Sequence, residues 1–184
     1  MPDVAVVGGG PAGLSAGLFT AKNGLETVVF DTDETWLHKA HLFNYLGIES
    51  VDGTAFVEDA RDQTAAVEAD LRQEAVEAVR VRAEEFVVTT DADEYATDYV
   101  VLATGADRQV AVDLGCAMAD DETVEVDLDM ETSVDDAYAT GAMVRAEKWQ
   151  AVISAGDGAA AALDILSKEK GEAFHDFDTP ADAE

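Results

Sequence analysis

A glycine-rich turn close to the first residue restricts the possible folds of this chain more than any other feature. The segment GGGPAG at positions 8–13 follows the apolar run Val4–Val7 and precedes the small-residue stretch Leu14–Lys22. A second apolar run, Thr27–Phe30, comes next and ends at Asp31. This order of strand, tight turn, helix and strand predicts a βαβ unit of about thirty residues.

The three spaced glycines and the acid after the second strand indicate a dinucleotide site. Gly8 permits the tight turn, Gly10 lets the backbone approach a pyrophosphate, and Gly13 lets the helix pack against the strand. The helix N-terminus offers free amide groups and a partial positive charge to the phosphates. Asp31 stands where a carboxylate can accept the hydroxyls of an adenosine ribose. A glycine-rich turn in an unrelated α/β fold is the alternative interpretation.

The chain carries a large negative charge that limits its partners. Its 184 residues include 40 Asp and Glu against 11 Lys and Arg, a net charge of −29, while 48% of the residues are hydrophobic. Such a chain can form a sizeable core, but its surface repels itself until molar salt shortens the screening length to about 3 Å. We therefore expect a salt-rich cytoplasm, as in a halophilic archaeon, with an acidic mesophilic protein as the alternative. Nucleic acid and anionic membranes are poor partners for this surface, and an anionic cofactor must be held mainly by backbone amides.

Cysteine and histidine usage argues against metal and disulfide chemistry in this sequence. The single cysteine, Cys116, excludes an internal disulfide, a CxxC redox pair and a multi-cysteine metal centre. His38 and His41 lie three residues apart without a third ligand nearby, so we expect structural or cofactor-adjacent histidines and no metal site. The sequence has no run of 18 apolar residues and no charged leader segment, which predicts a soluble, cytoplasmic protein.

The rest of the sequence predicts one domain over residues 1–184, ending in a flexible acidic tail at 168–184. Thr54 is the expected N-cap of the first helix after the βαβ unit. Ala75–Val81 and Glu85–Thr90 are expected to pair, with Asp91–Glu94 as their hairpin turn. The expected helices are Phe56–Ala69 and Lys148–Leu166, and the expected strands are Ala75–Val81, Glu85–Thr90, Asp98–Ala103, Thr123–Leu128 and Asp136–Ala139.

Several segments together resemble the flavin domain of the thioredoxin reductase family. The matching stretches, in chain order, are VAVVGGGPAGLSAGLFTAKNG at 4–24, FNYLG at 43–47, YVVLATGA at 99–106, TSVDDAYATGAMV at 132–144 and WQAVISAGDGAAAALDIL at 149–166. This resemblance implies the α/β fold class, specifically a Rossmann-like FAD-binding domain. It would have three layers (β/β/α): an additional small β-sheet, a parallel central sheet and helices.

The resemblance also implies roles for individual residues. The glycine turn would bind the FAD pyrophosphate and Asp31 the adenosine ribose. The tetrapeptide ATGA occurs at 103–106 and again at 139–142, each time at a strand end. The first copy would lie along the adenosine half of FAD and the second against the ribityl chain, with Gln150 and Ala151 near the pyrimidine edge of the flavin. The candidate cofactor contacts are Gly8, Gly10, Pro11, Ala12, Gly13, Asp31, Val76, Ala103, Thr104, Gly105, Gly141, Ala142, Gln150 and Ala151.

The chain departs from the family between the two ATGA copies and at the second copy. Only Asp107–Met130 connects the two strand ends, where family members usually carry an NADPH domain with the redox CxxC. About two dozen residues cannot form such a domain, so we do not expect a functional thioredoxin reductase. Ala142 stands where the family usually has an Asp that hydrogen-bonds the ribityl chain. Losing one such hydrogen bond is worth about 1.5–3 kcal/mol, which weakens FAD binding without abolishing it.

Two function classes remain open. The first is an FAD-dependent oxidoreductase or electron carrier, which receives electrons from a protein donor such as a ferredoxin or from a small molecule. The second is a non-catalytic flavin-binding or regulatory module, and a weaker alternative is an NAD site. No residue has the sequence context of a catalytic acid or base. Trp36, Phe43, Tyr45 and Trp149 can flank a flavin ring, fill the core or form a dimer contact. We expect a homodimer that covers the flavin face.

Overall fold

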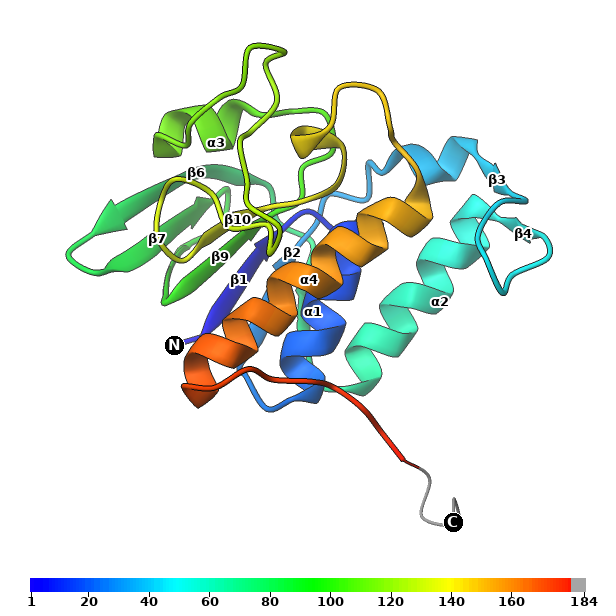
Figure 1. The fold of residues 1–184 in the computed structure, drawn as a ribbon, viewed down its shortest axis with the longest axis horizontal. Helices are drawn as coiled ribbons and strands as arrows, with labels where there is room; N and C mark the ends of the chain where they lie inside the picture. Colours follow the sequence, from blue (N-terminus) through cyan, green and yellow to red (C-terminus); the bar gives the residue numbers. More distant parts are fainter. Residues whose placement is uncertain (180–184) are drawn as a thin grey trace.

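Five parallel strands form the central sheet of the computed structural model, which describes residues 1–179 (Figure 1). The strands, in their spatial order, are β10 (Ala137–Ala139), β9 (Tyr99–Leu102), β1 (Val4–Val7), β2 (Thr27–Phe30) and β5 (Asp70–Arg72). Every residue of the first four strands in this order is buried. Burial on both faces explains why these strands are continuous apolar runs in the sequence.

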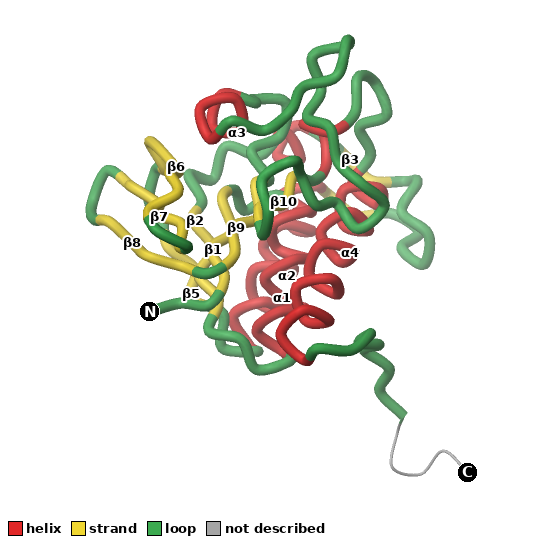
Figure 2. Tube along the Cα trace, turned by 60° about the vertical axis from the view of Figure 1, so that its left-hand side comes forward, coloured by secondary structure: helices red, strands yellow, loops and turns green. Residues whose placement is uncertain are grey.

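Three helices cover one face of this sheet, as Figure 2 shows with helices in red and strands in yellow. They are α1 (Pro11–Lys22), α2 (Gly53–Ala66) and α4 (Ala151–Lys170). Val4 and Val6 of β1 pack with Ala161 and Ile165 of α4 in the core on this side. The sequence is rich in Ala and Gly here because α1 and α4 lie close together.

A three-stranded antiparallel sheet covers the opposite face. Its strands are β6 (Val76–Arg82), β7 (Glu85–Thr90) and β8 (Glu94–Thr97). Val79, Phe86 and Val88 of this sheet pack against Ala5 and Val7, which alternate along β1 with the residues that face the helices. The three layers confirm the predicted α/β fold with a parallel central sheet and an additional small sheet.

Short elements lie in the connections between these strands and helices. They are the 3-10 helices η1 (Trp36–Lys39) and η2 (Gly141–Val144), the strand pair β3 (His41–Leu42) and β4 (Val51–Asp52), and α3 (Gln109–Leu114). The connection from β9 to β10 holds α3 and two isolated bridges, Met118 with Val124 and Glu131 with Tyr138. Within residues 1–179 this connection forms no second parallel sheet.

The predicted boundaries of two helices are wrong. The helix expected at Phe56–Ala69 spans Gly53–Ala66, and its N-cap is Asp52, whose carboxylate accepts from the Thr54 amide at 2.9 Å. The last helix runs to Lys170 and not to Leu166, so the first residues of the expected tail at 168–184 are helical. After this helix, Asp176 accepts a hydrogen bond from Lys22 Nζ of α1 at 2.8 Å. Residues 180–184 of the predicted tail lie outside the described residues.

The prediction of strands also failed in two places. The hairpin of β6 and β7 turns at Ala83, which has φ +59°, while 91–93 joins β7 to β8. The predicted strand Thr123–Leu128 does not form, and the segment has only the isolated bridge at Val124. Its amides bond to separate loops, Val124 N to Met143 O and Glu125 N to Ala117 O, which is why the alternating pattern was misleading. The short elements β5, β8 and α3 were not predicted.

Candidate functional site

A cleft of about 630 Å³ opens at the carboxyl ends of four adjacent strands of the central sheet. The residues that follow these strands, Gly8, Asp31, Ala103 and Thr140, all line it. From β1 the chain order runs outward to β2 and β5 on one side and to β9 and β10 on the other. Such a reversal of strand order places a crevice at the carboxyl edge of an α/β sheet, where ligands bind. The cleft is within the usual size range of small-molecule sites, about 300–1,000 Å³.

Two of the three spaced glycines of the turn have a steric reason to be glycine. Gly8 has φ +112°, and a Cβ on it would lie 2.4 Å from the carbonyl oxygen of Ala103. A Cβ on Gly13 would lie 1.8 Å from the carbonyl oxygen of Gly8, so the helix packs directly on the turn. Gly10 differs, because its Cβ would meet only Thr35 Oγ1, at 3.5 Å, and otherwise face open space. The backbone at Gly10 is therefore accessible from the cleft.

Two helix N-termini face this cleft without side-chain caps. The N-cap of α1 is Gly10 and that of α4 is Gln150, and neither makes a side-chain capping bond. Both N-caps line the cleft, as do Ala12 and Ala151 in the first turns. The first amides of an α-helix have no partner inside the helix, and the helix dipole adds a partial positive charge to them. The cleft therefore offers two groups of amide donors to a ligand rich in acceptors.

The two ATGA turns have the same backbone feature and lie side by side. Gly105 and Gly141, the third residue of each copy, have φ +70° and +71°. The Thr140 amide donates to the carbonyl oxygen of Leu102 at 3.0 Å, which joins the second turn to the end of β9. Arg108 ties the turns together, because its guanidinium donates to the carbonyl oxygens of Ala106 and Ala142, each at 3.3 Å. Both turns line the cleft with small side chains and leave its floor open.

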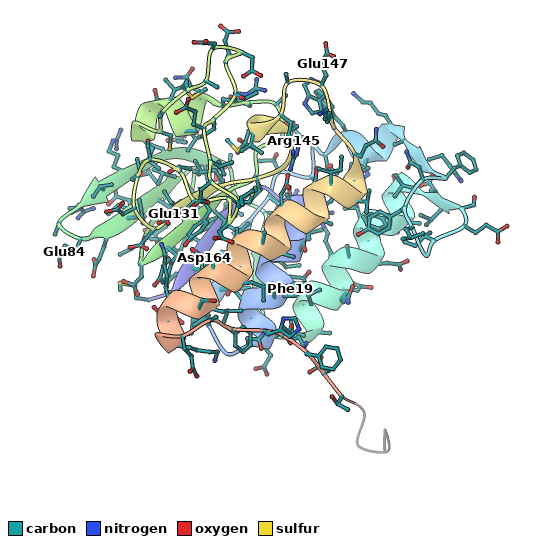
Figure 3. All side chains as sticks on the ribbon, in the orientation of Figure 1. Phe19, Glu84, Glu131, Arg145, Glu147 and Asp164 are labelled. Atoms are coloured by element: carbon teal, nitrogen blue, oxygen red, sulfur yellow. The ribbon has the colours of Figure 1, made fainter. Side chains whose placement is uncertain are left out.

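An ion pair with a buried carboxylate supports the second turn. Asp157 of α4 is 6% exposed and accepts from the Gly141 amide at 3.2 Å. Arg145 binds the same carboxylate in bidentate fashion, at 2.5 and 3.1 Å. Figure 3 shows Arg145 near the start of α4. Because one carboxylate joins the helix, the turn and the loop after it, the position of this part of the cleft is fixed by charge-assisted hydrogen bonds.

Asp31 lies in an ionic network at the other end of the cleft. Its carboxylate forms an ion pair with Arg61 of α2, which also contacts Asp33 Oδ1 at 2.7 Å. His38 Nε2 lies 2.7 Å from the same oxygen of Asp33. The Arg61 guanidinium, and then the His38 ring, hold the pKa of Asp33 below its usual range. Gly9 completes the contact, because a Cβ on it would lie 2.3 Å from the Asp31 carboxylate. A cavity of about 170 Å³ adjoins this network.

The charge of the cleft lining matches a site that uses backbone donors. Four carboxylates line it, those of Asp31, Glu34, Glu74 and Asp107. Among the described residues that form its walls there is no Lys or Arg. The arginines nearby are already engaged by protein groups, as Arg61 is by Asp31. A negatively charged ligand in this cleft would therefore depend on the two helix N-termini.

The structure brings together nearly all of the residues that the sequence singled out. Every candidate contact lines the cleft except Gly13, which packs beneath it. Trp36 and Trp149 also line the cleft, whereas Phe43 and Tyr45 do not. Phe43 packs against the His41 ring, and Tyr45 packs against Phe56. Residues 1–179 hold no group of three or more His, Cys, Asp or Glu side chains placed to bind a metal ion. None of the helices described there is long and apolar enough to cross a membrane.

Sequence reasoning missed several residues of the site. Gly9 and Arg61 position Asp31, Asp157 supports the second turn, and Asn44 Nδ2 donates to Gln150 Oε1 at 2.8 Å. Gly9, Asn44 and Asp157 lie within stretches that resemble the family, but no role was assigned to them, and Arg61 lies outside every such stretch. Arg61, Asp157 and Asn44 act on residues far away in the chain, so no local pattern identifies these contacts.

These features define a protein with a Rossmann-like, dinucleotide-binding fold. The family model of pyridine nucleotide-disulphide oxidoreductases matches residues 2–108 and, in a second match, residues 54–159. The chain belongs to this family.

Curated relatives include thioredoxin reductases and an NADH oxidase. The thioredoxin reductase of Mycolicibacterium smegmatis is 31% identical over 108 residues, which cover 56% of this chain and 35% of the relative. The thioredoxin reductase of Treponema pallidum is 32% identical over 117 residues, covering 58% and 36%. The NADH oxidase of Thermoanaerobacter brockii is 39% identical over 108 residues, covering 56% and 14%. The chain thus spans about a third or less of the length of these relatives.

Solved structures share the fold at low sequence identity. The thioredoxin reductase of Gloeobacter violaceus has a TM-score of 0.88 at 20% identity, covering 97% of this chain and 99% of the matched chain. The atypical thioredoxin reductase TRi of Desulfovibrio vulgaris Hildenborough has a TM-score of 0.86 at 18% identity, covering 94% and 99%. A ferredoxin-flavin thioredoxin reductase of Clostridium acetobutylicum has a TM-score of 0.82 at 17% identity, covering 93% and 99%.

Proposed function

We propose that this chain is an FAD-binding flavoprotein that acts as a small oxidoreductase or electron carrier. The observation that carries the proposal is that two uncapped helix N-termini, at Gly10 and Gln150, converge on one cleft lined by small-residue turns. FAD has acceptors at matching places, a pyrophosphate in its middle and carbonyl oxygens on its flavin ring. Membership of the oxidoreductase family and the similarity to thioredoxin reductases support a flavin.

The residues of the cleft have distinct binding roles in this proposal. The amides after Gly10 bind the pyrophosphate, and Asp31 accepts hydrogen bonds from the adenosine ribose. The turns at Gly105 and Gly141 pass beneath the adenosine half and the ribityl chain, and Ala151 presents its amide to the pyrimidine edge. When bound, the flavin supplies one- and two-electron chemistry. The chain contributes binding and orientation.

The electron donor is proposed to lie outside these residues. Within residues 1–179 the segment between β9 and β10 forms no second nucleotide-binding fold, and the sequence has a single cysteine. We therefore propose that these residues work without an NADPH domain or a redox disulfide of their own, and we expect no thioredoxin reductase activity from them. A protein donor such as a ferredoxin is supported by the structural similarity to a protein named a ferredoxin-flavin thioredoxin reductase.

The net charge of −29 leads us to propose a salt-rich cytoplasm as the working environment. We also propose a homodimer that covers the end of the cleft where the flavin ring would bind.

One purification and one donor screen test this function. The chain should be isolated in molar KCl, examined for a flavin spectrum, and mixed anaerobically with NADH, NADPH or a reduced ferredoxin. We expect a yellow protein that the ferredoxin reduces and the free nicotinamides do not. A protein that holds FAD but is reduced by no donor supports the alternative of a non-catalytic flavin-binding module. A colourless protein that binds NAD and not FAD contradicts the proposal.

A further inference from the structure

We propose that Trp36 and Trp149 form an aromatic platform that binds one face of the flavin ring of the cofactor. The inference rests on the proposed function. It assigns binding of the flavin ring to two particular side chains. Both indoles line the cleft, one from η1 and one from the segment just before α4.

The platform joins two segments that are far apart in the sequence. The ring centroids of Trp36 and Trp149 lie 5.3 Å apart at an interplanar angle of 60°, a favourable edge-to-face contact. A hydrogen bond of 2.8 Å from Asn44 Nδ2 to Gln150 Oε1 also joins the loop after β3 to the start of α4. The indole of Trp149 is fixed further because its Nε1 donates to the carbonyl oxygen of Arg145 at 2.7 Å. The two side chains therefore hold a defined position at the end of the cleft.

Their exposure shows that they are not core residues. Trp36 is 61% exposed and Trp149 is 39% exposed. Indole side chains contribute most to stability when their large apolar area is buried, so exposed ones that line a cleft are typical of a binding surface. Filling of the core, one of the alternatives left by the sequence, is therefore excluded for this pair.

The surroundings of the pair define the chemistry of its ligand. Gln150 and Ala151, at the uncapped N-terminus of α4, come directly after Trp149. A ligand group here meets flat apolar surfaces on one side and amide donors on the other. This combination suits a planar, uncharged heteroaromatic ring whose edge carries acceptor atoms. Adenine is expected at the opposite end, near Asp31, which leaves the flavin ring for the tryptophans.

The composition of the chain makes this inference directly measurable. Trp36 and Trp149 are its only two tryptophans, so the intrinsic indole fluorescence reports on the platform alone. Apoprotein in molar KCl should be titrated with FAD and, separately, with ADP, which fills only the adenosine end. We expect FAD to quench most of the indole emission and ADP to leave it nearly unchanged. FAD that binds without quenching overturns the inference and leaves the proposed function intact.

Substitutions test the energetic role of the pair. Trp36→Leu should weaken FAD binding about tenfold, the scale of one lost stacking contact, and leave ADP affinity unchanged. Unchanged ADP affinity also shows that the variant is folded. Phe43→Leu is the matched control, because Phe43 is 73% exposed in the neighbouring segment but does not line the cleft. It should bind FAD like the unaltered chain.

Other results contradict the inference. Equal losses of FAD affinity in Trp36→Leu and Phe43→Leu would show a general effect of exposed aromatic residues. A Trp36→Leu protein that changes from dimer to monomer with full FAD affinity would assign the pair to a contact between two copies. Failure of the unaltered chain to bind FAD would overturn the proposed function and this inference together.

Discussion

The carboxylate of Asp31 packs directly on the Cα of Gly9. A Cβ on Gly9 would lie 2.3 Å from the Asp31 carboxyl carbon, closer than such atoms approach one another. Arg61 holds the carboxylate from the other side. The acid that is expected to bind the ribose is therefore positioned by one residue without a side chain and by one cation.

Replacing Gly9 with Ala should displace Asp31 and weaken nucleotide binding. Gly9 does not have a positive φ, so alanine fits its backbone and the main effect falls on the carboxylate. Loss of a charge-assisted hydrogen bond of about 1.5–3 kcal/mol corresponds to roughly a ten- to hundredfold weaker affinity for ADP or FAD. Calorimetric titration with ADP measures this. A Gly9→Ala protein with unchanged ADP affinity would show that Asp31 does not contact the ribose.

Two glycines of α4 should respond to alanine in opposite directions. A Cβ on Gly158 would lie 2.0 Å from the carbonyl oxygen of Ala12 in α1, so Gly158→Ala should force the helices apart and cost about 1–3 kcal/mol of unfolding free energy. Gly156 is exposed and has no neighbour within 4 Å, so Gly156→Ala should add about 0.5–1 kcal/mol. Urea unfolding of both variants in molar KCl provides the comparison. Equal effects would mean that α1 and α4 are not in close contact.

Restoring an acid at position 142 should tighten FAD binding. Ala142 lines the cleft on the second turn, where the thioredoxin reductase family usually has an Asp. Ala142→Asp should lower the dissociation constant for FAD by about tenfold or more if the carboxylate accepts a ribityl hydroxyl. ADP, which lacks the ribityl chain, should bind with unchanged affinity. If FAD affinity does not change either, the second turn does not face that chain.

Removing one poorly placed acid should stabilise the protein in a pH-dependent way. Asp98 is an exposed residue, but partial desolvation of its carboxyl group, and then the nearby carboxylates of Asp3 and Glu85, raise its pKa above the usual value. A raised pKa means that Asp98 binds its proton more tightly in the folded state than in the unfolded state. Ionisation of Asp98 therefore lowers the stability of the fold as the pH rises through that pKa. Asp98→Asn should therefore be more stable than the unaltered chain at neutral pH and low salt.

The gain from Asp98→Asn should shrink in acid and in molar KCl. In acid the carboxyl group is already neutral, and salt screens the neighbouring charges. Urea midpoints at neutral pH and near pH 4, in low and high salt, test both trends. Glu172→Gln, which removes one charge from an exposed residue after α4, is the control. A gain that is equal at both pH values would contradict the assignment to Asp98 ionisation.

The local parts of the site could be predicted because each signal is contained in a few neighbouring residues. The glycine turn and both ATGA copies combine an apolar strand with small residues directly after it. Parallel strands end at one edge of a sheet, so turns at 8–13, 103–106 and 139–142 had to come together. Asp31 follows the same logic at the end of β2.

The remaining parts depend on contacts that the sequence does not encode locally. Arg61 lies on α2 in an ordinary polar context, and only the folded chain brings it to Asp31. Asp157 is likewise an acid in a small-residue helix until Gly141 and Arg145 bind it. The prediction of a strand at 123–128 failed because a local pattern was present there without the contacts of a strand. Its alternating pattern is typical of a strand, but its amides bond to separate loops.

The central claim is that this cleft holds a complete FAD molecule, and the flavin content of the native protein tests it most directly. The chain should be purified without leaving molar KCl, freed of unbound cofactor, and measured by visible absorption against protein concentration. We predict the absorption bands of an oxidised flavin at about one FAD per chain, with apoprotein recovering them when FAD is added back. A folded, colourless protein that takes up no FAD in the same salt would contradict the account.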